Sequence, residues 1–179
     1  MIYLIRHGEA AASWGTHPNP GLSETGRTQA EAVAMLLKDV AISTIHSSPM
    51  QRCQETAEAF ARLSGIDLVI EPKVTEIPTP QEVDDRVSWL QQLMSGNWSD
   101  APELVQSWRR DLIETVSALP DETVVFTHFV AINAIVGHLE GSDSVTVFRP
   151  NYCSQTKLQR QGDRMTLVER GESLVTKVL

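Results

Sequence analysis

The sequence predicts an α/β fold, a three-layer α/β/α sandwich with a mostly parallel central sheet, formed by a single domain over residues 1–179. Two observations predict it. The apolar runs at residues 2–5 and 123–127 are nearly continuous, which is typical of parallel strands covered on both faces. Segments with helical spacing lie between the β-rich runs, and this alternation implies right-handed crossovers and a mostly parallel sheet.

Each expected strand ends at a polar or charged cluster. The first is expected at residues 2–5, the second at residues 43–46 and the third at residues 123–127. In open α/β sheets, ligands bind beyond the carboxyl ends of the strands. The residues that follow each run are therefore the candidates for function.

Three amphipathic helices are expected between these strands. Ser23 and Thr25 precede the first helix, and Ser48 and Pro49 supply a capping hydroxyl and a first-turn proline for the second. Apolar residues recur at helical spacing in each segment: Ala30, Val33, Ala34 and Leu37, then Cys53, Ala57 and Phe60, then Leu104, Trp108, Leu112, Val116 and Leu119.

The remaining segments are less regular. Residues 72–100 contain several prolines around a short helix at residues 87–94, and we expect a small insertion over one sheet edge. After Gly141 the chain is β-rich, and antiparallel or edge strands are expected at residues 144–148, 153–158 and 165–170.

Composition narrows the class of protein. The 179 residues are 41% hydrophobic and 21% charged, as in a globular protein with a sizeable core. The formal net charge of −8 argues against broad contact with nucleic acid or a membrane surface. The N-terminal apolar run is too short for a signal or a membrane span, so a cytoplasmic protein is expected. The two cysteines, Cys53 and Cys153, are expected to be unpaired.

Four residues at strand ends indicate a phosphate site. Arg6 and His7 follow the first strand, Arg52 follows the second, and His128 follows the third. A guanidinium directly after a buried strand needs an anion or another acceptor, and two arginines around one pocket match the oxygens of a phosphate. Arg52 stands in the first turn of a helix, where an anionic ligand would offset its unfavourable place in the helix dipole.

Two other interpretations stand beside this one. Each histidine, taken alone, is typical of a packed or capping residue, and two histidines with Glu76 could bind a metal. The arginines would repel a divalent cation, so we predict no metal and no cofactor.

The chain resembles the histidine phosphatase superfamily, the phosphoglycerate mutase-like group. The resemblance rests on four blocks in the family's order: Leu4-Ile5-Arg6-His7-Gly8-Glu9, Leu22-Ser23-Glu24-Thr25-Gly26-Arg27, residues 47–57 and Val124-Val125-Phe126-Thr127-His128. It implies a phosphoglycerate mutase-like fold and a phosphatase in which His7 attacks phosphorus and forms a phosphohistidine that water then hydrolyses. Arg6, Arg52 and His128 would bind the transferring group.

The resemblance also implies a proton donor, for which Glu76 is the candidate, with Glu82, Asp84 and Asp85 as alternatives. The sequence departs from the family at Phe129, where glycine is usual, and at Ala10, where a small hydroxyl residue is usual. An aromatic ring at position 129 is expected to line the pocket. Ser13 and Asn19 are further candidates for substrate contact.

Two other functions remain open at this point. One is phosphoryl transfer of the mutase type, and the other is a non-catalytic module that binds a phosphorylated ligand. The expected partner is a small phosphorylated molecule, with a phosphoprotein as the alternative, and the sequence gives no oligomeric state. Selection among substrates is expected from the insertion, between Thr75 and Asp100.

Overall fold

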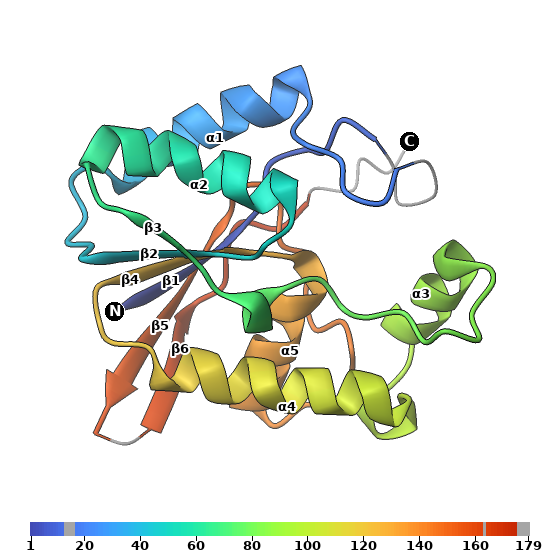
Figure 1. Cartoon of the computed structure of the whole chain (residues 1–179). Helices are drawn as coiled ribbons and strands as arrows, with labels where there is room; N and C mark the ends of the chain where they lie inside the picture. The colour runs from blue at the N-terminus through green and yellow to red at the C-terminus, as the bar shows by residue number, and fades with distance from the viewer. Residues whose placement is uncertain (13–16, 163, 175–179) are drawn as a thin grey trace.

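The computed structural model describes residues 1–12, 17–162 and 164–174. A six-stranded sheet crosses the molecule (Figure 1) in the order β3-β2-β4-β1-β5-β6. Its strands are β1 (Ile2–Arg6), β2 (Thr44–Ser47), β3 (Leu68–Ile70), β4 (Thr123–Thr127), β5 (Gln155–Gln161) and β6 (Arg164–Glu169). The predicted α/β class with a mostly parallel sheet is confirmed.

The parallel part of the sheet positions the site. β4 lies between β1 and β2 and is parallel to both, with Arg6 opposite Thr127 and Ser47 opposite Phe126. β3 extends this parallel part, whereas β5 and β6 run antiparallel at the other side. The carboxyl ends of β1, β2 and β4 therefore meet at one edge, which brings together the residues that follow them.

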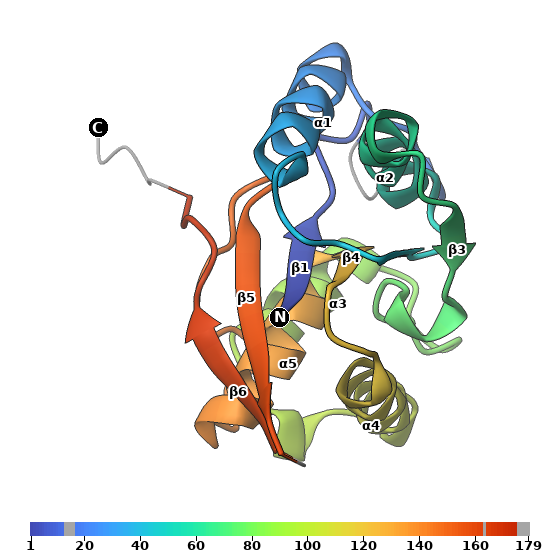
Figure 2. The same cartoon turned by 90° about the vertical axis from the view of Figure 1, so that its left-hand side faces the viewer.

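Two pairs of helices cover the sheet, as Figures 1 and 2 show. Helices α1 (Glu24–Leu37) and α2 (Gln51–Ser64) pack on one face, and α4 (Glu103–Ala118) and α5 (Phe129–Glu140) pack on the other. Most of the apolar positions recognised in the sequence are buried and form two cores, but Leu104 is wrong: it is 48% exposed, and the neighbouring Val105 is buried in its place. One core contains Ile5, Ala30, Val33, Ala34, Leu37, Ile45, Ala57, Phe60, Val124 and Phe126, and the other contains Ile2, Leu4, Val105, Trp108, Leu112, Val116 and Val125.

The sequence predicted the start of the first helix correctly and the start of the second helix wrongly. Ser23 is the N-cap of α1, and its side chain accepts a hydrogen bond from Gly26 N. The expected cap of the second helix at Ser48 is wrong, because α2 begins at Gln51 with Met50 as its N-cap. The Ser48 hydroxyl accepts from Met50 N over 3.2 Å, before the helix begins, and also bonds to a histidine ring, described below.

Residues 72–100 form two short 3-10 turns, η1 (Pro72–Val74) and η2 (Trp98–Asp100), around helix α3 (Arg86–Met94). In Figure 1, α3 lies to the right of the labelled strands. The buried residues Leu90 and Leu93 of α3 and Trp98 of η2 join the core on the α4 and α5 side.

The β-rich tail was predicted in part. Residues 144–148 form no strand: Ser144 makes only an isolated bridge to Asn97, and the amides of Val147 and Phe148 donate to the side chain of Asn133. β5 starts at Gln155, two residues later than expected. Strand β3 had not been predicted. Within the described residues, no helix has the length and apolarity needed to cross a membrane.

Candidate active site

The segment after β1 is held tightly against the first turn of α1. His7 N donates to Thr127 O over 3.0 Å, and Gly8 N donates to the Thr56 hydroxyl over 3.0 Å. A Cβ on Gly8 would lie 2.7 Å from the backbone oxygen of Gly26, closer than any side chain allows. Glycine at position 8 therefore lets the chain turn beneath α1 and fixes the position of His7.

The hydrogen bonds of His7 define its tautomer. Nδ1 lies 2.7 Å from the carbonyl oxygen of Gly8, and a carbonyl can only accept, so Nδ1 carries the proton. Nε2 accepts a hydrogen bond from Arg52 Nε over 3.2 Å. Burial lowers the pKa of His7 well below its usual value, and the charges of His128 and Arg52 lower it further. The ring is a neutral imidazole whose unprotonated nitrogen, Nε2, faces Arg52.

Arg6 is a buried cation without a carboxylate partner among the residues that the structure describes. It is 7% exposed, its Nη1 donates to Pro150 O over 2.9 Å, and its Nε has no hydrogen-bond partner within the described part of the chain. Burial lowers its pKa from the usual value. The guanidinium carbon lies 3.9 Å from the ring centroid of Tyr152 and 5.3 Å from that of Phe129. These aromatic contacts hold the group without neutralising it, as an anion-binding site requires.

Arg52 connects the other polar residues. It stands in the first turn of α2 and is buried. Besides its bond to His7, its Nη2 donates to Glu76 Oε2 over 3.0 Å and lies 3.2 Å from His128 Nδ1. One guanidinium thus contacts the candidate nucleophile, the candidate proton donor and the second histidine.

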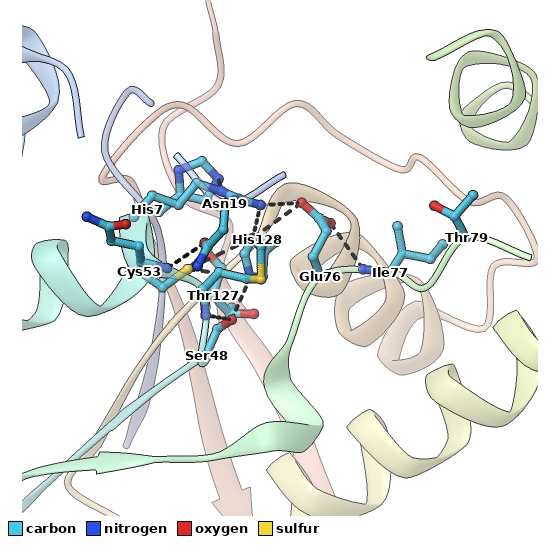
Figure 3. Close-up of polar contacts among 12 residues, drawn as sticks. His7, Asn19, Ser48, Cys53, Glu76, Ile77, Thr79, Thr127 and His128 are labelled. Carbon is cyan, nitrogen blue, oxygen red and sulfur yellow. Dashed lines mark hydrogen bonds and ion pairs between the residues drawn. The ribbon is translucent and has the colours of Figure 1, made fainter. Parts of the chain in front are cut away.

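His128 is fully buried as the N-cap of α5, directly after β4. Its Nδ1 lies 3.3 Å from Glu76 Oε2, and its Nε2 lies 2.8 Å from the Ser48 hydroxyl. We assign the proton to Nδ1, facing the carboxylate, with Ser48 donating to Nε2. Burial lowers the pKa of His128, although the Glu76 carboxylate acts in the opposite direction. Figure 3 shows these contacts converging.

Glu76 follows η1 and faces Arg52 and His128. Its Oε1 accepts from Ile77 N over 3.2 Å, a contact that can be followed in Figure 3. Burial by itself raises the pKa of this carboxyl, but His128 and Arg52 outweigh it and hold the pKa well below its usual range. Glu76 is therefore ionised at neutral pH in this arrangement.

A cavity of about 520 Å³ opens beside these groups. It is lined by Arg6, His7, Arg52 and Glu76 and by a set of less polar residues, Ala10, Ala11, Ala12, Pro20, Val87, Phe129, Val130 and Tyr152. His128 contacts Arg52 and Glu76 but is not part of this lining. The two arginines give the polar end of the cavity a positive charge that suits a phosphoryl group better than a metal cation.

The weaker candidates from the sequence have different positions. Phe129 lies in the cavity lining, where its ring was expected. Asn19 is outside that lining, and its Oδ1 accepts from Gln51 N at the start of α2. Ser13 falls outside the described residues.

Two residues of the site were missed from the sequence, Ser48 and Tyr152. Ser48 had been read as a helix cap, although it follows the second strand and so stands at the same sheet edge as His128. Tyr152 lies in the tail, where no motif marked it. It reaches the site because Cys153 N donates to Arg6 O over 2.9 Å, which joins two segments far apart in the chain.

Curated relatives of similar sequence are named as mutases. The chain is 27% identical to the probable phosphoglycerate mutase GpmB of Photorhabdus laumondii, with 79% of this chain and 75% of that protein covered. It is 25% identical to the probable phosphoglycerate mutase GpmB of Erwinia tasmaniensis, with 90% and 85% covered.

Solved structures of similar fold include several phosphatases. A phosphoserine phosphatase of Entamoeba histolytica, in complex with 3-phosphoglyceric acid, superposes with a TM-score of 0.76 at 20% identity over 97% of both chains. A mycobacterial glucosyl-3-phosphoglycerate phosphatase in complex with VO3 gives a TM-score of 0.71 at 23% identity, covering 96% of this chain and 99% of that one. At such identities these structures establish the fold.

The family assignment rests on a match along most of the chain. The model of the histidine phosphatase superfamily (branch 1) matches residues 2–173, a range that includes the six strands and the residues gathered around His7. The chain belongs to the histidine phosphatase superfamily.

Proposed function

We propose that this chain hydrolyses phosphate monoesters through a covalent phosphohistidine on His7, with no metal taking part. The observation that carries the proposal is the state of His7. Its Nδ1 proton is bound by Gly8 O and its Nε2 lone pair lies beside Arg52, at the positive end of the cavity. A neutral, fixed imidazole among cations is suited to attack on phosphorus.

In the first step, Nε2 of His7 forms a bond to phosphorus while the ester P–O bond breaks. The leaving oxygen takes up a proton and departs as an alcohol. Arg6 and Arg52 neutralise charge on the equatorial phosphoryl oxygens, and a protonated Nδ1 of His128 donates to one of them. Gly8 O stabilises the ring of His7 as it becomes cationic, because it continues to accept from Nδ1.

We assign the proton for the leaving group to Glu76, which is ionised before the substrate binds because its pKa is held well below the usual range. A bound phosphoryl group competes for Arg52 and His128, which are the groups that lower the pKa of Glu76. It also places negative charge nearby, which raises that pKa. A phosphate monoester titrates near pH 6, so its monoanion carries the proton that Glu76 takes up.

In the second step, water attacks the phosphohistidine. The P–N bond breaks, inorganic phosphate leaves and His7 returns to the neutral imidazole. Glu76, left as a carboxylate by the first step, accepts the proton of the attacking water. One carboxyl thus acts as acid and then as base.

The test is phosphate release from an aryl phosphate in the presence of EDTA, across pH 5 to 8, by the wild type and by His7→Ala. Release is expected from the wild type alone. A rapid acid-free quench with mass spectrometry of the intact protein should detect a phosphorylated species that is absent from His7→Ala. Equal release by both proteins would refute the role of His7.

The curated relatives favour a second candidate, phosphoglycerate mutase activity. A mutase returns the phosphoryl group to its substrate rather than to water. Incubation with 3-phosphoglycerate and analysis of the products separates the two, since 2-phosphoglycerate without free phosphate supports the mutase. Tight phosphate binding with neither product supports a binding module.

A further inference from the structure

The lining of the cavity beside His7 contains residues of two chemical kinds. Arg6, His7, Arg52 and Glu76 form its polar end, and the proposed reaction uses all of them. Eight other lining residues carry no formal charge: Ala10, Ala11, Ala12, Pro20, Val87, Phe129, Val130 and Tyr152. The part of the substrate beyond the phosphoryl group would lie against these eight residues.

Two of these eight residues carry aromatic rings that lie beside the polar end. Phe129 and Tyr152 both contact the Arg6 guanidinium, with centroids 5.3 Å and 3.9 Å from its central carbon, and both belong to the lining. Tyr152 also lies close to the nucleophile, with 6.0 Å between its ring centroid and that of His7. Phe129 stands where the family usually has glycine, so an apolar wall replaces open backbone beside the reaction centre.

Further cations lie in neighbouring cavities rather than in this one. Arg149 lines a cavity of about 450 Å³ that shares Arg6 and Phe129 with the first. Arg86 lines another, of about 320 Å³, on the side of Arg52 and Glu76, where its Nε donates to the Thr79 hydroxyl over 2.7 Å. Among the described residues, the cations in the lining of the cavity beside His7 are Arg6 and Arg52, both of which the phosphoryl group would engage.

We propose that the substrate is a phosphate monoester whose leaving group is compact, uncharged and apolar, such as an arylalkyl alcohol. Apolar surface on such a group replaces water against the alanine, valine and aromatic side chains, which is favourable. A carboxylate or a polyol at the same place loses hydration without gaining partners. This inference rests on the proposed function, because it assumes that the phosphoryl group binds at the polar end.

The test compares esters whose leaving alcohols have similar acidity, so that binding and not chemical reactivity decides. The substrates are 2-phenylethyl phosphate, glycerol 1-phosphate and 3-phosphoglycerate. We expect kcat/KM for the phenylethyl ester to exceed that of the other two by at least about tenfold, because a single methylene in an apolar pocket already changes kcat/KM by a factor of about ten or more. Equal or higher values for 3-phosphoglycerate would overturn the proposal.

A pair of matched variants ties the preference to the cavity. Val87 lines the cavity and is 37% exposed, and Val168, on β6, is 49% exposed and outside the lining. Val87→Thr keeps the side-chain volume and adds a hydroxyl, and it should narrow the ratio of kcat/KM between the phenylethyl and glycerol esters several-fold. Val168→Thr should leave that ratio unchanged. The same ratio in both variants would contradict the assignment.

A binding measurement keeps this inference separate from the proposed function. Calorimetric titration of His7→Ala with 2-phenylethyl phosphate and with glycerol 1-phosphate reports affinity without turnover. At least about tenfold tighter binding of the phenylethyl ester is expected. If the wild type releases no phosphate from any ester, the proposed function fails, and this affinity ratio still decides the leaving-group preference. Equal affinities would refute it.

Discussion

Replacement of Glu76 by glutamine is expected to tighten the binding of inorganic phosphate while it slows turnover. Glu76 Oε2 lies 3.0 Å from Arg52 Nη2 and 3.3 Å from His128 Nδ1, so it occupies the contacts that a phosphoryl oxygen requires. A phosphate that binds must displace this carboxylate and tolerate its negative charge. A neutral amide of the same shape competes less and repels nothing.

The magnitude follows from the kind of hydrogen bond that is lost. A hydrogen bond to a charged group contributes about 1.5–3 kcal/mol and a neutral one about 0.5–1.5 kcal/mol. The amide therefore weakens the competition by about 1–2 kcal/mol, which corresponds to a Kd for phosphate about 5- to 30-fold lower. Loss of a general acid–base group should lower kcat by about 100-fold or more.

The assay is calorimetric titration with phosphate at pH 7, together with steady-state turnover of an aryl phosphate. Glu140→Gln is the matched control: Glu140 ends α5, opposite to His128, and pairs with Arg170 over 2.6 Å. Both variants remove one negative charge from a formal net charge of −8. A Glu76→Gln protein that is folded and binds phosphate as weakly as the control would refute the competition.

Three further perturbations test the geometry around His7. Burial lowers the pKa of the His7 ring in the folded state, so the unfolded chain takes up the proton first as the pH falls. The free energy of unfolding, measured with urea, should therefore fall from pH 7.5 to 5.5 by up to about 1.4 kcal/mol per pH unit for this group. A free energy that does not change with pH would contradict this prediction. Gly8→Ala places a Cβ 2.7 Å from a backbone oxygen and should cost about 1–3 kcal/mol of stability, whereas Gly96→Ala, with 3.5 Å to its nearest atom, should cost far less in the same urea titration. Tyr152→Ala removes the ring over Arg6 and should weaken phosphate binding roughly tenfold in calorimetry, and Tyr152→Phe, which keeps the ring, should not.

The sequence predicted those parts of the fold whose signal is local. The buried runs at β1 and β4 are apolar almost throughout, and the buried faces of α1, α2 and α4 repeat at the helical period. Helix α5 was not predicted, because its residues 130–137 are all buried and show no such repeat. β3 escaped notice because it has only three residues and stands half-exposed at the sheet edge. Residues 144–148 look like a strand, but their amides are satisfied by Asn133 from α5, a partner that no local pattern reveals.

The sequence predicted the site residues that stand just after the ends of strands. Arg6, His7, Arg52 and His128 follow three strands that the parallel sheet places side by side, so their convergence could be inferred. The roles of Ser48 and Tyr152 depend on contacts between distant segments. Nothing near Tyr152 in the sequence indicates that its ring will lie over Arg6.

The position of β4 has a consequence for how the chain folds during synthesis. β4 lies between β1 and β2 in the sheet. The first 120 residues therefore contain β1 and β2 but not the strand that pairs with both, which is residues 123–127. A nascent chain that ends before β4 exposes strand edges and two unfinished apolar faces, the condition in which chains aggregate or engage chaperones. Because most pairings join distant segments, collapse to the native sheet is a late and cooperative event. The candidate active site, whose residues range from Arg6 to Tyr152, is completed only at that same moment.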